Sequence, residues 1–196
     1  MIRPALRLND ERDEVLAGLA ATGSGAAFAV LVTRHRGAVC AIALNMSATL
    51  RDAERVLQQT FLVAWQEMRA FSAEMSFATF LYRIAIRTAL AQRPRERERS
   101  SAVLEALQPA FDGEGRLQAS REGWRDVDRL EQMELSGLLR EALDCVDDRA
   151  RAAFVLRDVL GLPLGEAGAV LETSTEAIAR EAHRARLMLR GFIGGL

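Results

Sequence analysis

Residues 161–192 read GLPLGEAGAVLETSTEAIAREAHRARLMLRGF. Apolar residues recur every three or four positions on both sides of a polar stretch at 172–175, which predicts a short helix after Pro163 and a longer helix over about 176–192. Thr173 and Glu176 have the spacing of a capping box, and Gly161 is expected to end the preceding helix. A short helix, a tight turn and a longer helix form a helix-turn-helix.

Apolar stripes of the same period run through most of the chain. They predict helices over residues 28–46, 53–68 and 77–88, packed into one small core around Trp65 and the phenylalanines, with Ser76 as the cap of the third helix. Further stripes at 135–143 and 153–160 precede the helix-turn-helix. No stretch alternates between apolar and polar residues as a half-buried strand would. The predicted fold class is therefore all-α.

Charge divides the chain into three pieces. The 196 residues carry 26 basic residues, all of them arginine, and 27 acidic ones. The net charge is +4 over residues 1–99, −4 over 100–134 and −1 over 135–196. Pro94 and the charged run after it should end the third helix. We expect two small helical domains, 1–99 and 135–196, joined by an acidic linker at 100–134 that proteases cut first, between about Arg95 and Arg129.

The sequence offers little for catalysis. Its histidines are His35 and His183, and it contains no HExxH motif, no nucleophile elbow and no glycine-rich phosphate loop. His35 falls on the buried stripe of its helix, so we expect a satisfied core or boundary residue. Cys40 and Cys145 lie far apart without a CxxC pattern, which favours reduced cysteines over a disulfide or a metal site. We therefore expect no enzyme, no catalytic residue, no metal and no cofactor.

The chain is expected to be cytoplasmic and not inserted in a membrane. Charged residues interrupt each apolar run before it reaches the ~18 residues that a membrane span needs. Residues 1–13 carry charges where a signal peptide would have an apolar core, so export is not expected.

The longer helix of a helix-turn-helix lies in the major groove of DNA and offers its outward side chains to bases and phosphates. Here the outward residues are Thr175, Ala179, Arg180, His183, Arg184 and Arg186. Arginines at such positions neutralise phosphates or pair with guanine. A plain packing module of three helices would have the same apolar spacing, and the pattern alone leaves this alternative open.

Three blocks of sequence carry a resemblance to one family. GLPLGEA at 161–167, LETS at 171–174 and HRAR at 183–186 are similar to region 4 of the extracytoplasmic-function (ECF) sigma factors of RNA polymerase. DAERVLQQTFLVAW at 52–65 resembles region 2.2 of this family, and FSAEMSFATFLYRIA at 71–85 resembles regions 2.3 and 2.4. The blocks occur in the family's order and spacing, and the resemblance covers roughly residues 25–99 and 135–192.

The resemblance implies three binding surfaces and no enzymatic activity. The surface for core RNA polymerase, through its β′ coiled coil, would consist of Asp52, Glu54, Arg55, Gln58, Gln59 and Leu62. The surface for the melted −10 element would consist of Phe71, Ser72, Ser76, Tyr82, Arg83 and Arg87, whereas Phe77 and Phe80 are expected mainly in the core. The surface for the −35 element would consist of Thr175, Arg180, His183, Arg184 and Arg186. Further implied partners are the polymerase β flap, promoter DNA and an anti-sigma factor.

The sequence departs from the family's pattern on all three of these surfaces. Arg55 and Gln59 stand where the family usually has acidic residues, Phe80 stands for tryptophan, and Arg87 for asparagine. The helix over 176–192 begins EAIARE instead of GTVKSR, so Glu181 adds repulsion toward phosphate. An alternative is therefore a sigma-like adaptor that binds polymerase or another regulator without recognising promoters. An ordinary helix-turn-helix repressor is a third interpretation, but it leaves the region 2 block unexplained.

Overall fold

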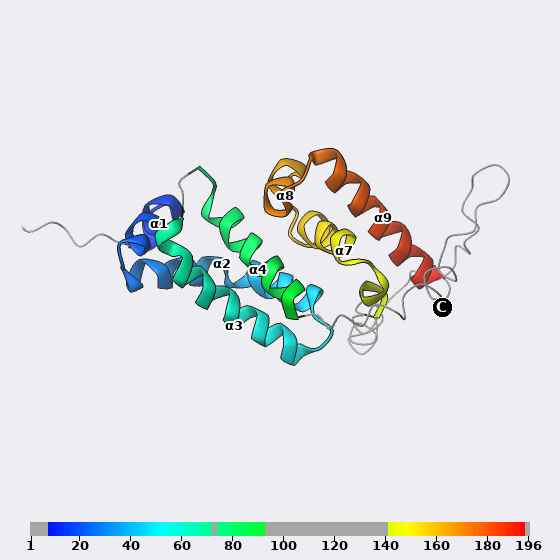
Figure 1. Ribbon diagram of the computed structural model, residues 1–196, viewed down its shortest axis with the longest axis horizontal. Helices are drawn as coiled ribbons and strands as arrows, with labels where there is room; N and C mark the ends of the chain where they lie inside the picture. Colours follow the sequence, from blue (N-terminus) through cyan, green and yellow to red (C-terminus); the bar gives the residue numbers. More distant parts are fainter. Residues whose placement is uncertain (1–7, 72–73, 93–140, 195–196) are drawn as a thin grey trace, which may run out of the picture. The chain divides into compact units, whose positions relative to one another are not determined.

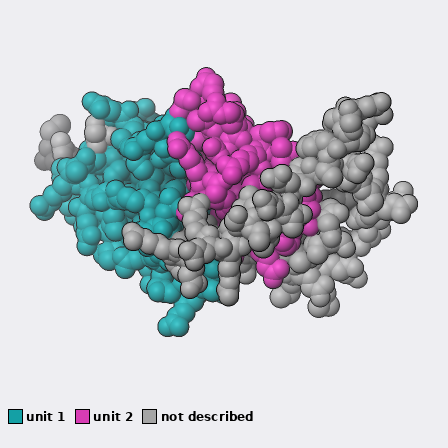
Figure 2. All heavy atoms as spheres, turned by 45° about the vertical axis from the view of Figure 1, so that its right-hand side comes forward, with its two compact units in different colours: residues 1–93, 168–173 teal, residues 94–167, 174–196 magenta. Residues whose placement is uncertain are grey.

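The computed structural model describes residues 8–71, 74–92 and 141–194. The expected linker at 100–134 and Ser72 lie outside these residues. The chain divides into two compact units, one formed by residues 1–93 with 168–173 and the other by residues 94–167 with 174–196 (Figure 2). All regular elements within the described ranges are helical, which confirms the all-α fold class.

The first unit is a bundle of four α-helices with short 3₁₀ turns (Figure 1). Its elements are η1 (Leu8–Asp10), α1 (Asp13–Ala21), α2 (Gly25–Met46), α3 (Leu50–Glu67), η2 (Met68–Ala70) and α4 (Phe77–Gln92). Helix α2 packs against α1, α3 and α4, and α3 packs along α4. Helix α4 is described as far as Gln92, and Pro94, which is predicted to end it, lies outside the described residues.

Hydroxyl side chains cap the N-terminal ends of α2, α3 and α4. The Ser24 Oγ accepts a hydrogen bond from the Ala27 amide at the start of α2, and the Thr49 Oγ1 accepts one from the Asp52 amide at the start of α3. The Ser76 Oγ accepts a bond of 3.1 Å from the Thr79 amide, which confirms its predicted role as the cap of α4. Each cap satisfies an amide that has no partner within its own helix.

The core of the first unit follows the predicted stripes with one correction. Leu31, Ile42, Val56 and Phe77 are buried, and each such side chain contributes roughly 1.5–3 kcal/mol through removal of apolar surface from water. Trp65 is 38% exposed, so the expectation that it forms the centre of the core is wrong. The buried face of α3 is formed by smaller residues, which are Ala53, Val56, Thr60 and Ala64.

Helix α2 is long and apolar enough to span a membrane by length and composition alone, a test that core helices of soluble proteins also pass. This differs from the expectation that no apolar run is long enough. Arg34 and Arg36 lie in the middle of α2, and Leu31, Val39 and Ile42 are fully buried within the bundle. The apolar residues of α2 therefore have an interior role in this fold.

The C-terminal part of the chain contains a helical stretch at 141–145 and four further elements (Figure 1). These are α7 (Asp148–Phe154), the π-helix η3 (Val155–Val159), α8 (Leu164–Leu171) and α9 (Thr175–Gly194). Helix α9 packs along α7, and their shared core includes Leu143, Val146, Ala185 and Leu189. The order α8, turn, α9 is the predicted helix-turn-helix.

A π-turn changes which residues point inward before α8. The Leu160 amide donates to the Val155 carbonyl, five residues back, so the turn contains one more residue than an α-helical turn. Val159 is consequently 40% exposed, although the apolar stripe predicts it to be buried. Gly161 has a φ of +68°, the left-handed conformation that glycine adopts most easily, and this confirms its predicted place at the end of the helix.

Candidate protein and nucleic-acid interfaces

The outward face of α3 presents the residues expected to bind polymerase. Glu54, Arg55, Gln58 and Gln59 are exposed, and Leu62 is 49% exposed. Asp52 is partly buried, because its carboxylate accepts hydrogen bonds from the Thr49 Oγ1 at 2.6 Å and from the Arg55 Nη2 at 2.5 Å. Arg55 therefore neutralises the charge of Asp52. The face that α3 presents to a partner consists more of amide groups and a leucine than of net charge.

Trp65 extends this face by one helical turn. It lies three residues after Leu62, and its ring packs against that of Phe28 on α2 with centroids 5.0 Å apart. One side of the indole is therefore held by the bundle while the other is open. Sequence reasoning assigned Trp65 to the core, but its three-residue spacing from Leu62 was a signal for the outward face.

Three phenylalanines surround the start of α4. Phe71 lies 6.1 Å from Phe77 and 5.2 Å from Phe80, measured between ring centroids. Phe77 is buried, as expected for a core residue, whereas Phe71 and Phe80 are partly exposed. Ser76 is exposed beside them, and its hydroxyl also lies 2.9 Å from that of Thr79. An aromatic surface of this kind suits an unpaired base.

Tyr82 differs from its expected role as a surface contact. Its side chain is 8% exposed, and its ring lies 6.2 Å from that of His35 in an edge-on arrangement. Helix α4 turns Tyr82 toward α2, whereas Arg83 is partly exposed and Arg87 exposed. The expectation that Tyr82 lies on the surface is thus corrected by its packing against His35.

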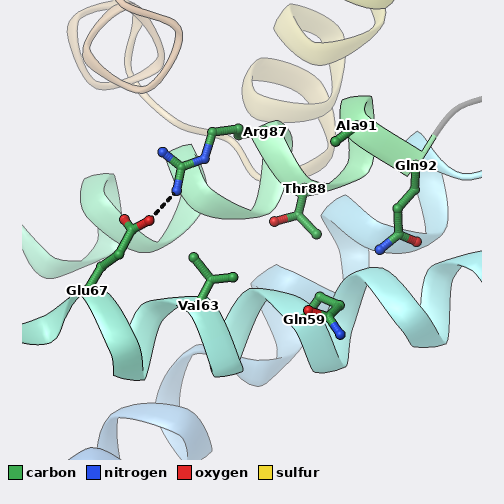
Figure 3. A pocket seen from close by; sticks show the side chains of 7 residues that line it. All are labelled: Gln59, Val63, Glu67, Arg87, Thr88, Ala91 and Gln92. Atoms are coloured by element: carbon green, nitrogen blue, oxygen red, sulfur yellow. Dashed lines mark hydrogen bonds and ion pairs between the residues drawn. The ribbon is translucent and has the colours of Figure 1, made fainter.

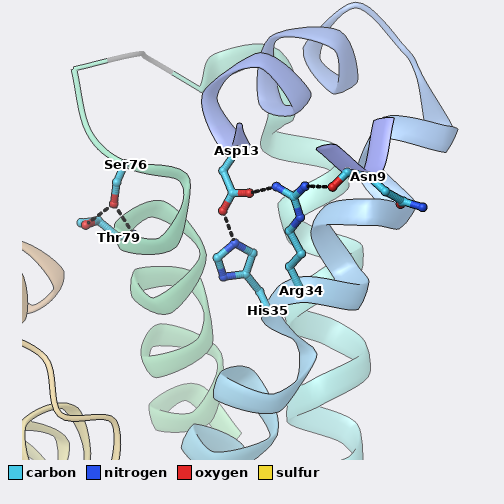
Figure 4. Close-up of polar contacts among 6 residues, drawn as sticks. All are labelled: Asn9, Asp13, Arg34, His35, Ser76 and Thr79. Carbon is cyan, nitrogen blue, oxygen red and sulfur yellow. Dashed lines mark hydrogen bonds and ion pairs between the residues drawn. The ribbon is translucent and has the colours of Figure 1, made fainter. Parts of the chain in front are cut away.

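His35 joins α2 to α1 (Figure 4). Its Nε2 lies 2.6 Å from the Asp13 Oδ2, and the other carboxylate oxygen of Asp13 accepts a hydrogen bond of 2.6 Å from Arg34. Arg34 also donates to the Asn9 carbonyl. Partial burial raises the pKa of Asp13, but the hydrogen bonds and charges of Arg34 and His35 outweigh it and hold this pKa below its usual value. The interpretation of His35 as a satisfied boundary residue is confirmed.

A groove between α3 and α4 brings two of the predicted surfaces together (Figure 3). Its lining residues are Gln59, Val63, Glu67, Arg87, Thr88, Ala91 and Gln92. Gln59 belongs to the predicted polymerase surface and Arg87 to the predicted −10 surface. The Arg87 Nη2 donates to the Glu67 Oε1 at 2.7 Å across the groove. Arg87, predicted for the −10 surface, is therefore in an ion pair with Glu67 at the end of α3, the helix predicted to bind polymerase.

Helix α9 exposes all five residues of the predicted −35 surface, which are Thr175, Arg180, His183, Arg184 and Arg186. The cap of α9 is Ser174, whose Oγ accepts from the Ala177 amide at 3.2 Å, so the predicted capping box at Thr173 is one residue out of register. A hydrogen bond from its own backbone, with others from Ser174 and Thr175, lowers the pKa of Glu176. Glu176 therefore stays negative at neutral pH in the first turn of α9.

Two arginines of α9 are paired with acidic residues. The Arg184 Nη1 lies 3.2 Å from the Asp147 Oδ2 and 3.9 Å from the Glu181 Oε2. The Arg186 Nε donates to the Asp158 Oδ1 at 2.9 Å. Arg180 and His183 complete the basic part of this face. The structure thus exposes all the predicted −35 residues on α9 but balances much of their charge.

Within the described ranges, no group of three or more His, Cys, Asp or Glu residues is arranged to hold a metal ion. Cys40 and Cys145 are both free thiols. Burial, followed by the nearby carboxylates of Asp144 and Glu141, raises the pKa of the Cys145 thiol. A raised pKa disfavours the thiolate, so Cys145 is a poor nucleophile here.

Two family models match the chain. The model for Sigma-70 region 2 matches residues 31–99, and the model for Sigma-70, region 4 matches residues 136–189. Region 2 thus includes α3, α4 and most of α2, and region 4 includes α7, α8 and most of α9. These two regions in this order define a sigma factor of RNA polymerase.

Known relatives show to which family of sigma factors the chain belongs. It is 29% identical over 188 residues to the RNA polymerase sigma factor CnrH of Cupriavidus metallidurans, a match that spans 94% of this chain and 95% of CnrH. It is 27% identical over 182 residues to the ECF RNA polymerase sigma-E factor of Salmonella typhimurium, spanning 89% of this chain and 90% of that protein. The chain belongs to the ECF family of sigma factors.

Solved structures agree with this assignment. The structure of CnrH in complex with the cytosolic domain of CnrY has a TM-score of 0.65 and 26% identity, and the match covers 93% of this chain and 97% of that chain. The sigma factor RpoE in complex with the anti-sigma factor NepR, from Bartonella quintana, shares the fold at a TM-score of 0.59, 20% identity and coverage of 85% and 96%. As a sigma factor, this protein binds RNA polymerase and directs promoter recognition and transcription initiation.

Proposed function

We propose that the outward face of α3 is the surface that binds core RNA polymerase, through its β′ coiled coil. The observation that supports this assignment is the exposure of Leu62 and Trp65 beside Gln58, on the helix that lies within the region 2 match. Exposed large apolar side chains in a soluble protein mark contact surfaces, and an aromatic residue rimmed by amides is typical of an interface centre. Asp52, Glu54, Arg55 and Gln59 form the polar rim.

The −10 surface is assigned to the start and the exposed side of α4. Phe71 and Phe80 offer partly exposed rings for an unpaired base, with Ser76 next to them. Arg83 and Arg87, four residues apart on α4, are placed to hold the phosphates of the melted strand. Tyr82 is left out of this surface because it is buried.

The −35 surface is assigned to α9. Thr175, Arg180, His183, Arg184 and Arg186 are exposed on the second helix of the helix-turn-helix, the element that enters the major groove in this motif. Glu176 and Glu181 reduce the positive charge of this helix, so we expect weak affinity for DNA outside the holoenzyme. The polymerase β flap is the proposed protein partner of this domain.

An anti-sigma factor is the proposed regulator. CnrH was solved with the cytosolic domain of CnrY and RpoE with the anti-sigma factor NepR. By this analogy the chain would be held inactive by a partner protein until a signal releases it, and it would act in the cytoplasm, where polymerase and DNA meet. The proposed domain boundaries remain 1–99, 100–134 and 135–196.

Run-off transcription with purified core polymerase and a set of promoter templates tests this function. We expect transcripts that depend on this chain from at least one template. Co-purification with polymerase without such transcripts would favour the sigma-like adaptor, because docking would then be separate from promoter recognition. Binding to duplex DNA without any polymerase binding would favour a repressor.

A further inference from the structure

Both exposed arginines in the middle of α9 have carboxylates as neighbours. The Arg184 Nη1 is 3.2 Å from the Asp147 Oδ2, and the Arg186 Nε is 2.9 Å from the Asp158 Oδ1. Asp147 precedes α7 and Asp158 lies in η3, so the acids come from other elements than the arginines. The Arg184 pair therefore connects α9 to the start of α7, on which it packs, and the Arg186 pair connects α9 to η3.

The two aspartates are less exposed than the arginines that they contact, and Asp147 is also fixed by its own helix. The Asp147 Oδ1 accepts hydrogen bonds from the amides of Arg149 at 3.2 Å and Ala150 at 3.1 Å, which leaves the Oδ2 for Arg184. The side chains of Asp147 and Asp158 are also less exposed than those of their arginine partners. The Asp147 carboxylate is thus fixed at the start of α7, and both guanidinium groups are more accessible than the carboxylates that they contact.

The pairs make the charge of the recognition helix nearly neutral. Helix α9 carries four arginines, at 180, 184, 186 and 190. Glu176 and Glu181 of the same helix, together with Asp147 and Asp158, supply four carboxylates on or beside it. A surface of this kind releases few counterions from DNA, so it gains little affinity from phosphates.

We propose that Asp147 and Asp158 compete with DNA phosphates for Arg184 and Arg186 and thereby set the strength and the salt dependence of DNA binding by α9. This inference rests on the proposed −35 function of α9. Both arginines are exposed, whereas their aspartate partners are partly buried. Ion pairs at a protein surface are weak, so a phosphate that approaches in the major groove displaces the aspartates, but at a loss of affinity. The aspartates keep the free protein from binding DNA indiscriminately, and contacts in the holoenzyme supply what the helix lacks.

The test uses the full chain and a fluorescent mixed-sequence DNA duplex, with affinity measured by anisotropy from low salt upward. Asp147→Asn keeps the N-cap, because the amide oxygen of asparagine also accepts hydrogen bonds, and removes the charge. Asp158→Asn removes the second charge. Each variant should raise affinity about threefold to fivefold and steepen the slope of log affinity against log salt by up to about 0.9. Glu14→Gln, an exposed acid on α1, changes the net charge equally and should have no such effect.

Variants of the arginines separate this inference from the function on which it rests. Arg186→Ala should weaken DNA binding, and Asp158→Asn should gain much less in that background because the pair no longer exists. If Asp158→Asn raised DNA affinity equally with and without Arg186, or if Glu14→Gln raised it as much, competition for the arginines would be excluded. Simple repulsion between carboxylates and DNA would then explain the gain. No gain in either aspartate variant, while Arg184→Ala and Arg186→Ala weaken binding, would overturn the inference and leave the −35 function standing. No effect of any arginine variant, either in this assay or in binding of the holoenzyme to a −35 duplex, would overturn the −35 function itself.

Discussion

Trp65 on α3 packs its ring against Phe28 on α2, with centroids 5.0 Å apart and planes inclined by 56°. The contact fixes the indole without burying it, because 38% of Trp65 stays exposed. Leu62, one turn earlier on α3, is exposed beside it. A preordered aromatic side chain loses little conformational entropy when a partner covers it, so this pair is a favourable anchor for a protein interface.

Disruption of this anchor should abolish polymerase binding. We expect the double variant Gln58→Arg, Leu62→Arg to lose co-purification with core polymerase, and Trp65→Ala to weaken it by about 2 kcal/mol or more, as a hot-spot residue would. Helical circular dichroism should stay unchanged, because all three side chains lie on the surface. Val15→Arg, at a similarly exposed apolar residue on α1, is the control. Unchanged binding in the double variant would show that α3 is not the docking helix.

Substitutions at Glu67 and Arg87, which form an ion pair, should have opposite effects on promoter opening. Arg87→Ala should reduce melting of the −10 element and lower the salt slope by about 0.7, the value for one phosphate of a single strand. Glu67→Gln should favour melting, because it releases the Arg87 guanidinium that now lies 2.7 Å from the Glu67 carboxylate. Permanganate reactivity of unpaired thymines in the holoenzyme–promoter complex measures both. Equal permanganate reactivity with both variants and with the wild type would show that Arg87 is not part of the −10 surface.

Glu181 is the third carboxylate near the recognition-helix arginines, with its Oε2 at 3.9 Å from the Arg184 Nη1. Glu181→Arg should tighten binding of the holoenzyme to a −35 duplex and steepen its salt dependence by about one phosphate contact, since a repulsive charge becomes an attractive one. Glu181→Gln should give an intermediate affinity. Arg184→Ala should weaken binding. The absence of any change in this series, measured by anisotropy across a range of salt, would favour the adaptor function.

Arg151 is fully buried, and its Nη1 donates to the Asp144 Oδ1 at 2.5 Å. The pair joins the helical stretch at 141–145 to α7. Asp144→Asn leaves the guanidinium buried without this charged partner and should destabilise the C-terminal unit by about 1–3 kcal/mol. Asp158→Asn breaks an exposed pair and should cost about 0–1 kcal/mol. Hydrogen exchange of the α7 amides measures the local loss of stability. Equal protection of these amides in both variants would contradict the prediction that the buried pair contributes more than the exposed pair.

The lowered pKa of Asp13 predicts that the folded protein loses stability in acid. Its pKa is lower in the folded protein than its usual value, because Arg34 and His35 favour the carboxylate. A group of this kind stabilises the fold above its unfolded pKa of about 3.9, and the contribution disappears as the pH falls through the folded pKa. Asp13→Asn should therefore lower the thermal midpoint at neutral pH and match the wild type in strong acid. Glu14→Gln should behave as the wild type throughout, and a pH-independent deficit in Asp13→Asn would indicate a packing defect instead.

Much of the fold could be predicted because helical periodicity is a local property. The stripes of α2, α3 and α4, the Ser76 cap and the turn at Gly161 all depend on residues a few positions apart. The register of the α9 cap was predicted one residue early, since Thr173 and Ser174 are both acceptable caps by sequence. The π-turn at η3 could not be predicted, because an added residue leaves no mark in the apolar pattern.

The sequence by itself determined most of the helices and the family to which the chain belongs, since these depend on residue type and spacing along one chain. Only the tertiary structure decided that Trp65 is open, that Tyr82 is buried against His35, and that Arg184 and Arg186 are held by Asp147 and Asp158. The physical reason is that burial and ion pairing depend on which helices pack together. Arg186 and Asp158 are 28 positions apart in the sequence, so they meet only after the helices have packed.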